Sequence, residues 1–209
     1  ISLKQVIGGG FLHGDEGAFA HGVHLRRVAP QEQRDEAQPE GFVEKFGVER
    51  IRNTPLCESA IVGTALGLAI KKRKAIMEMQ FADFVTVGFN QIINNLAKLY
   101  YRWEENADVV IRMPTGAGVG AGPFHSQSNE AWVFHVPGLK LVFPSNPYDA
   151  KGLLSSSIDD NNPVLFFEHK ALYRSSKRRV PSNEYNIELG KLKIIKEGND
   201  MSIITYGLG

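Results

Sequence analysis

The sequence has very little cysteine: Cys57 is the only one among 209 residues. A single thiol cannot form an internal disulfide, so the fold must be held by packing, as in reducing compartments. Long apolar runs are missing too. The longest, residues 60–70, is interrupted by Thr64 and followed by lysines and arginine, which makes it too short to cross a bilayer. No signal peptide opens the chain. We therefore expect a cytoplasmic (bacterial) or mitochondrial-matrix protein with no membrane partner.

The sequence also lacks an excess of charge of either sign. Its 24 Lys and Arg residues and 23 Asp and Glu residues give a net charge of +1. Such a chain has no field that would collect phosphate backbones, so we expect no nucleic-acid partner. The 43% hydrophobic and 22% charged residues are ordinary for a globular protein, and the length suits one core.

The region from residue 30 to residue 41 is polar and charged, which predicts a linker or loop before order resumes near Phe42. Beyond it, apolar β-prone runs alternate with helical patterns, and Asn146 with Pro147 marks a helix start. This alternation predicts an α/β fold: a mainly parallel sheet with helices on both faces. Ligands in such sheets lie at the carboxyl ends of strands, here after Met79, Met113 and Phe143. The expected strands are residues 75–81, 109–113, 139–143, 164–168 and 201–206, and the expected helices are residues 59–70, 84–101 and 149–158.

A glycine-rich run at residues 116–122 superficially satisfies a dinucleotide-binding pattern after a predicted strand. However, Pro123 and Phe124 stand where a helix should begin, and no acidic residue follows about 20 positions later to bind a ribose. No lysine of the P-loop type follows the glycines. We therefore favour a loop that allows close backbone approach.

Two titratable residues are candidates for chemistry, each with a plainer alternative. Glu58 precedes an apolar helix, where a carboxylate suits the positive end of the helix dipole. Because its neighbours supply no cation, it is also expected to be partly desolvated and able to share a proton with a ring nitrogen. His125 follows the glycine run and either faces a substrate or bonds to backbone. His135 and His169 lie in or beside apolar elements and are weaker candidates. The spacing of the remaining histidines matches no metal signature.

Several motifs in one order carry a resemblance to a known family. They are NTPLCESAIVG at residues 53–63, QFADF at 80–84, HSQS at 125–128 and PSNPYDAKG at 144–152, followed by Asn162-Pro163 and Leu172-Tyr173-Arg174. With these motifs the chain resembles, from about Phe42 to Gly209, the beta subunits of pyruvate and branched-chain 2-oxo acid dehydrogenases.

The resemblance implies a transketolase-like pyrimidine-binding domain and specific roles for its residues. Glu58 would face the aminopyrimidine nitrogen of thiamine diphosphate, with Gln80 and Phe84 lining and stacking on that ring. His125 would be a second catalytic residue, facing the substrate and assisting acyl transfer. Backbone oxygens near Ser157 and Asp160 and the side chain of Asn162 would hold a potassium ion.

The resemblance also implies partners. The Gly-Asp-Gly sequence with a downstream asparagine that holds magnesium in these enzymes is absent here, so an alpha subunit would supply the diphosphate site. The expected assembly is alpha2beta2, with beta-to-beta contact and docking to a lipoyl-acyltransferase core. The reaction would be oxidative decarboxylation of pyruvate or a branched-chain 2-oxo acid, with activity only in the presence of the alpha subunit. Gly63 and Gly67 leave bare backbone on one face of the helix at 59–70, which favours a close helix contact.

The sequence departs from the family at both ends. Residues 1–41 align poorly, with Gly14-Asp15-Glu16 as an echo of an acidic turn. We therefore divide the chain into an N-terminal segment and linker (1–41), a pyrimidine-binding domain (42–200) and the start of a C-terminal domain (201–209).

Three other readings stay open. A transketolase or deoxyxylulose phosphate synthase fits the motifs less well. A 2-oxo acid:ferredoxin oxidoreductase needs cluster cysteines somewhere in its complex, and Cys57 alone offers none. A non-catalytic nucleotide-binding α/β module would use the glycine run for a phosphate.

Overall fold

The computed structural model describes residues 24–27, 42–118 and 120–209. The linker expected at residues 30–41, the Gly14-Asp15-Glu16 turn, His13 and His21 lie outside the described residues.

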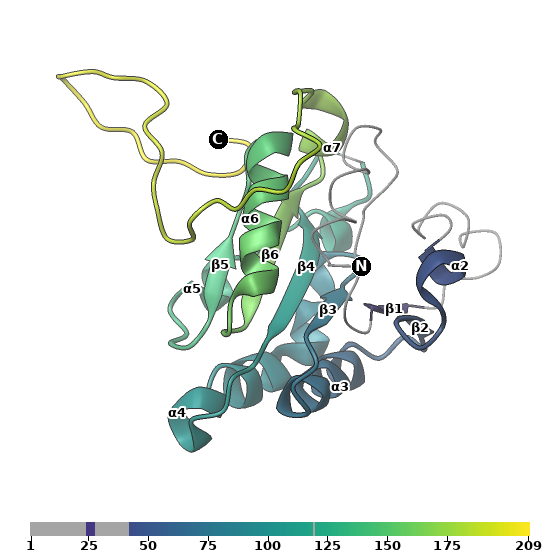
Figure 1. The fold of residues 1–209 in the computed structure, drawn as a ribbon. Helices are drawn as coiled ribbons and strands as arrows, with labels where there is room; N and C mark the ends of the chain where they lie inside the picture. Colours follow the sequence, from purple (N-terminus) through teal and green to yellow (C-terminus); the bar gives the residue numbers. More distant parts are fainter. Residues whose placement is uncertain (1–23, 28–41, 119) are drawn as a thin grey trace.

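Parallel strands form a six-stranded sheet in the order β2-β1-β3-β4-β6-β5 (Figure 1). Every strand pair within the described ranges is parallel, which confirms the expected sheet. The sheet includes β1, which lies in the N-terminal segment that the sequence left unplaced. The strands are β1 (His24–Arg27), β2 (Ile51–Thr54), β3 (Ala75–Glu78), β4 (Val109–Thr115), β5 (Lys140–Val142) and β6 (Val164–His169).

Hydrophobic cores lie on both faces of the sheet, because successive side chains of a strand point to opposite sides. In β4, Ile111 and Met113 enter one core and Val110 enters the other. The first core is covered by α3 (Glu58–Ile70), η2 (Ala82–Gly88) and the π-helix η3 (Gln91–Leu96). The second is covered by α6 (Pro147–Asp159), with α2 (Phe42–Phe46) packed against it. Helices on both faces, as predicted, are therefore confirmed.

The two long helices form close to where the sequence places them. Asn146 caps the N-terminus of α6, and its side chain accepts a hydrogen bond from the Asp149 backbone N–H at 3.0 Å. Pro147 occupies the first turn, where its missing N–H costs nothing. Helix α3 is apolar over most of its length and buries Ile61, Val62 and Ala65.

The helix expected at residues 84–101 is confirmed as a helical stretch, but it is not a single α-helix. It forms η2, η3 and α4 (Leu99–Trp103) in succession. The first of these packs closely on α3, since a Cβ added at Gly88 would lie 3.2 Å from a methyl carbon of Val62. At the far end Glu104 adopts a left-handed conformation with φ of 56°, which stops α4.

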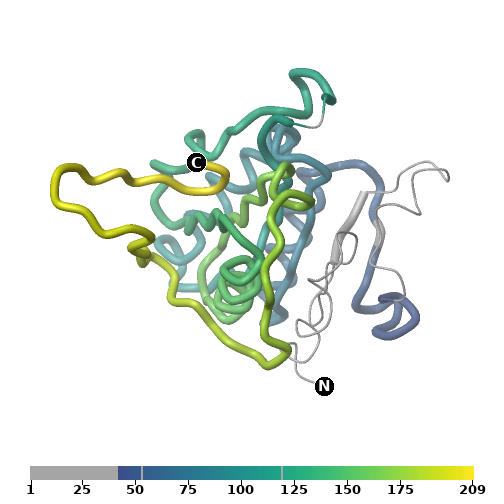
Figure 2. Tube along the Cα trace, turned by 90° about the horizontal axis from the view of Figure 1, so that it is seen from above, coloured from purple at the N-terminus to yellow at the C-terminus, as the bar shows by residue number. Residues whose placement is uncertain are grey.

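The strand expected at residues 201–206 is also wrong, because this run has no partner strand among the described residues. From residue 176 to residue 209 the chain has neither helix nor strand. Its first part is held along α6 by Lys151, whose ammonium donates to the carbonyls of Pro181 and Asn183. Its last part loops away from the body and returns (Figure 2), where the Tyr206 ring packs 5.2 Å from that of Phe143.

The remaining short elements are η4 (Pro123–His125), α5 (Ala131–Phe134) and α7 (Leu172–Ser175). Within the described ranges, no helix has the length and apolar character needed to cross a bilayer.

Candidate functional site

The carboxyl ends of β3, β4 and β6 are adjacent in the sheet, so the segments that follow them meet at one edge. Gln80 is exposed in the connection after β3, the glycine run follows β4, and Lys170 follows β6. Lys170 continues the pairing of these strands, since its backbone N–H donates to the Thr115 carbonyl at 3.0 Å. This edge therefore gathers the residues that the sequence singled out at the ends of β3 and β4.

Aromatic rings from two connections meet there. The ring centroids of Phe84 and His125 are 5.5 Å apart, and that of Phe81 lies 4.9 Å from His125, both edge to face. Phe81 and Phe84 also contact each other edge to face at 5.9 Å. Such geometry is favourable for aromatic pairs. Two of the predicted site residues, Phe84 and His125, are thus side by side.

The segment that carries His125 is fastened by its backbone. The Gln127 carbonyl accepts from the Thr115 hydroxyl and the Gly116 N–H, each at 3.0 Å. The Gln127 N–H donates to an Asp83 carboxylate oxygen at 3.1 Å. Asn129, which follows, donates to the Ala82 carbonyl at 2.7 Å. Strand β4 and η2 together hold this segment, which does not behave as a free loop.

The glycine run has the conformation of a loop in close contact with its neighbours. Gly116, Gly118 and Gly122 all have positive φ, of +84°, +103° and +73°. A Cβ at Gly116 would lie 2.2 Å from His169 Nε2, so only glycine fits over that ring. The run leads into η4, a turn of three residues, and the helix required by a dinucleotide site does not follow. The rejection of the dinucleotide reading is therefore confirmed.

Glu58 is the first residue of α3 and is buried, with 9% of its surface exposed. The end of η2 packs against it, because a Cβ at Gly88 would lie 3.4 Å from the Glu58 carbonyl oxygen. Within the part of the chain that the structure describes, its carboxylate has no hydrogen-bond or ion-pair partner. The site therefore fits a ligand that brings a ring nitrogen to Glu58 and an aromatic face to Phe84.

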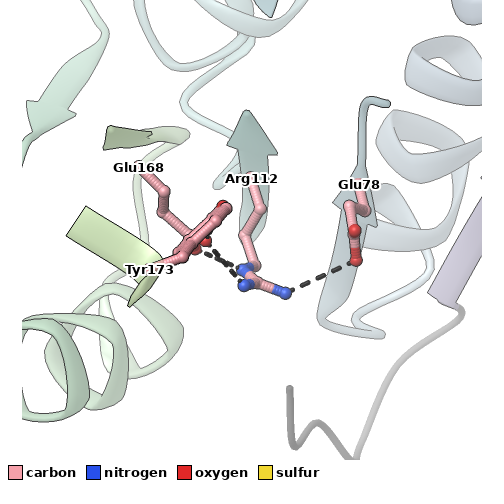
Figure 3. A network of polar contacts seen from close by, with 4 residues as sticks. All are labelled: Glu78, Arg112, Glu168 and Tyr173. Atoms are coloured by element: carbon pink, nitrogen blue, oxygen red, sulfur yellow. Dashed lines mark hydrogen bonds and ion pairs between the residues drawn. The ribbon is translucent and has the colours of Figure 1, made fainter. Parts of the chain in front are cut away.

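Beneath this edge, on the α6 face of the sheet, an ion cluster joins three strands (Figure 3). Arg112 donates to both oxygens of Glu168, at 2.6 and 2.9 Å, and its remaining nitrogen lies 3.4 Å from Glu78. Burial lowers the pKa of Arg112, but Glu168 and Glu78 outweigh it and raise that pKa overall. The Tyr173 hydroxyl donates to Glu168 at 2.7 Å, and burial together with this carboxylate raises the pKa of Tyr173. The cluster ties β3, β4, β6 and α7 together below the site.

The potassium residues lie at the opposite edge, between the end of α6 and the start of β6. The Ser157 hydroxyl donates within α6. One Asp160 carboxylate oxygen accepts from Asn162, and the other accepts from Lys140 at 2.5 Å. Lys74 lies 3.5 Å from the Asp160 carbonyl oxygen. Lysine ammonium groups thus face a carboxylate oxygen and the carbonyl oxygen of Asp160. The potassium assignment stays a prediction.

For magnesium, the described ranges contain no group of three or more His, Cys, Asp or Glu side chains able to hold a metal ion. The residues around Glu58 and Phe84 thus suit an aromatic ring with a protonatable nitrogen, and a magnesium site supplied by a partner subunit stays a prediction.

Sequence reasoning missed Asp83 and Lys170, which hold the segment bearing His125. A sequence signal was present for Asp83, which lies inside the QFADF motif, whereas nothing in the local pattern marks Lys170, after β6, as a buried residue. His169, judged a weaker candidate, lies against the glycine run at the same edge.

Comparison with known proteins agrees with this geometry. Residues 14–176 match the family model of the transketolase pyrimidine-binding domain, starting inside the segment that we expected to align poorly. Over 170 residues, or 80% of this chain, the sequence is 49% identical to the 2-oxoisovalerate dehydrogenase subunit beta of Bacillus subtilis, of which it covers 52%. The pyruvate dehydrogenase E1 component subunit beta of Staphylococcus aureus is 48% identical over the same length and is also covered to 52%. These identities confirm the resemblance to beta subunits.

The chain spans about half the length of the curated relatives it matches. A solved structure described as a split gene transketolase, inactive beta4 tetramer, has the same fold, with a TM-score of 0.66. It is 22% identical, and the match covers 89% of this chain and 56% of that one. The matched family model extends over most of the chain and includes the strands and helices that build the site. The chain belongs to the transketolase pyrimidine-binding domain family.

Proposed function

We propose that this chain is the pyrimidine-binding part of the beta subunit of a thiamine-diphosphate-dependent 2-oxo acid dehydrogenase. The enzyme decarboxylates a 2-oxo acid and passes the acyl group to the lipoyl arm of an acyltransferase. The observation that carries the proposal is the buried residue Glu58, whose side chain has no hydrogen-bond or ion-pair partner in the described ranges and whose backbone packs against the element that presents Phe84. The similarity of the chain to the beta subunits of two kinds of dehydrogenase supports the same reaction class.

Thiamine diphosphate, when bound, supplies the electron sink that decarboxylation of a 2-oxo acid requires. The chain's own residues hold one end of it. Glu58 shares a proton with the aminopyrimidine nitrogen, Phe84 stacks on the ring, and Gln80 lines it. His125, in contact with the Phe84 ring, donates a proton during acyl transfer.

The rest of the site comes from partners. We propose that an alpha subunit supplies the diphosphate and magnesium ligands, in an alpha2beta2 assembly that docks to a lipoyl-acyltransferase core. The relatives named for 2-oxoisovalerate and for pyruvate are 49% and 48% identical to this chain, so overall identity does not choose between these substrates. A methylene in an apolar pocket is worth only about 1–3 kcal/mol, so turnover of a panel of 2-oxo acids is the appropriate measurement. The proposed location is the cytoplasm or the mitochondrial matrix.

The direct test of the proposed chemistry is Glu58→Gln in the complex reconstituted with the alpha subunit. The amide keeps the size of the side chain and removes the group that shares the proton. Decarboxylation should fall by about 10²–10⁴ while circular dichroism and thermal unfolding stay close to wild type. Glu49→Gln is the matched control, because Glu49 is exposed and pairs with Arg52 far from the aromatic cluster. Full activity of Glu58→Gln would remove the basis of the proposal.

A further inference from the structure

Lys170 is a buried cation at the carboxyl edge, with 7% of its surface exposed, in the connection from β6 to α7. A lysine in this position is costly unless its ammonium finds partners. Its partners therefore indicate what the residue is for.

The Lys170 ammonium is linked to His125 by one direct contact and by one contact through Phe81. It donates a hydrogen bond of 2.6 Å to the backbone carbonyl of His125 itself. It also lies 4.8 Å from the centroid of the Phe81 ring, in a cation–π contact, and that ring packs edge to face on the imidazole at 4.9 Å. One side chain thus holds both the backbone of His125 and the ring against which its side chain rests.

Asp83 completes the arrangement from the opposite element. Its side chain is 6% exposed, and one carboxylate oxygen accepts from the Gln127 N–H at 3.1 Å. The other oxygen has no hydrogen-bond partner among the described residues. Burial lowers the pKa of Lys170, and the negative charge of Asp83 opposes that change. Both residues therefore hold the same segment, Lys170 at the His125 carbonyl and Asp83 at the Gln127 N–H.

From these contacts we propose that Lys170, with Asp83, clamps residues 125–127 and sets the orientation of the His125 imidazole. Lys170 is then a positioning residue for acyl transfer. The inference rests on the proposed function, which places His125 at the substrate. The competing explanation is that Lys170 only stabilises the fold.

A spectroscopic measurement on the full chain separates these explanations. Because His125 lies edge to face with Phe81 and Phe84, its ring protons should show ring-current-shifted resonances, assigned by comparison with His125→Gln. Lys170→Met, which keeps an unbranched stem but removes the charge and the donors, should move these resonances towards those of an exposed histidine. Lys170→Arg should largely restore them, since a guanidinium can donate to the same carbonyl and lie over the same ring.

Lys151→Met is the matched control. Lys151 is also a buried lysine that donates to backbone carbonyls and lies over a tyrosine ring, at 5.2 Å from Tyr185, but in α6 on the other face of the sheet. The Lys151→Met substitution should lower the thermal stability of the protein without moving the His125 resonances. If Lys170→Met leaves these resonances in place, or if Lys151→Met moves them equally, the clamp is wrong.

One further variant keeps the test decisive. Where Lys170→Met does not fold, Asp83→Asn replaces it: the amide oxygen still accepts from Gln127 but the charge is gone, and the His125 resonances should move in the same direction. Unchanged resonances in that variant would also overturn the clamp.

In the reconstituted complex, acyl transfer to a lipoyl domain should fall by up to about 10²-fold in Lys170→Met, and adding His125→Ala should cause little further loss. If His125→Ala alone leaves acyl transfer unchanged, the proposed function of His125 fails. The measurement of the His125 resonances still tests whether Lys170 positions His125, because it does not depend on acyl transfer.

Discussion

The imidazole of His125 lies at a place where several restraints meet. Backbone hydrogen bonds at Gln127 fix the segment, and the rings of Phe81 and Phe84 pack on the side chain. This fixed position matters because proton donation requires the donor to lie within hydrogen-bond reach of the reacting group. A flexible loop histidine would spend little time in such a position.

His125→Ala should therefore separate two steps of the reaction. Acylation of a lipoyl domain should fall more than decarboxylation, which is followed with an artificial electron acceptor. The reason is that only acylation uses His125 as a proton donor. Both rates should be measured on the same reconstituted complex. Equal losses in the two assays would mean that His125 acts earlier, at decarboxylation itself.

His169 gives a pH dependence that is separate from catalysis. Burial and the charge of Lys170 lower its pKa from the ordinary 6.5, while Glu130 acts in the opposite sense. Its Nδ1 accepts a hydrogen bond from the Ala171 N–H at 3.2 Å, which requires that nitrogen to be unprotonated.

Below pH 6.5 the unfolded chain begins to bind a proton at His169, whereas the folded chain does not until the pH reaches the lowered pKa. Stability that is present above pH 6.5 is therefore lost as the pH falls through the lowered pKa. In urea unfolding at about pH 7.5 and about pH 5.5, wild type should lose more stability than His169→Asn. The asparagine keeps an acceptor near Ala171 but does not titrate. Identical pH dependence in both proteins would show that His169 titrates normally in the folded state.

Single residues differed in how far the sequence could predict them. Glu58 could be identified because it opens a strongly apolar helix, and its burial follows from that context. Lys170 could not, since a lysine after a strand is usually exposed and its burial depends on Phe81 and His125 arriving from distant parts of the chain. Local sequence patterns do not predict contacts between residues that are distant in the chain.

Among the elements, β3, β4, β5, β6, α3 and α6 follow from apolar runs and a capping signal, which are local properties. The run at 84–101 has helical spacing as well and is helical, but it packs against α3 at Gly88 and is divided into η2, η3 and α4. The run at 201–206 has β-forming residues, but Ile203 and Ile204 are 79% and 76% exposed and pair with no described strand. Tertiary context decided both cases.

Helix α3 has a glycine whose place in the fold leaves it available for a partner. A Cβ added at Gly67 meets no described residue within 4 Å, whereas one at Gly63 meets Gln91 at 3.7 Å. Glycine in a helix costs about 0.5–1 kcal/mol relative to alanine, so an open glycine such as Gly67 needs an offsetting contact. We propose a second beta chain as that contact.

Gly67→Leu should therefore leave a chain that is at least as stable as wild type but no longer associates through α3. Light scattering of the reconstituted complex should give a lower mass. Gly198→Leu serves as control, because its added side chain also meets nothing within 4 Å but lies outside α3. An unchanged mass in Gly67→Leu would count against this interface.

For the molecule as a whole, the proposed function requires the described ranges to provide only one end of a cofactor site. Glu58 and Phe84 suit a pyrimidine ring, while the described residues offer no cluster of metal-binding side chains. Most of the charge of thiamine diphosphate lies in its diphosphate, which hard oxygen ligands and magnesium normally neutralise. Stacking and one carboxylate contact together contribute about 1–3 kcal/mol, far below the roughly 8 kcal/mol of micromolar binding.

Titration calorimetry of thiamine diphosphate with magnesium tests this shared-site account most directly. The isolated chain should give no micromolar binding, and addition of the matching alpha subunit should produce it. Glu58→Gln in the same complex should weaken that binding without preventing assembly. Micromolar, magnesium-dependent binding to the isolated chain would contradict the account.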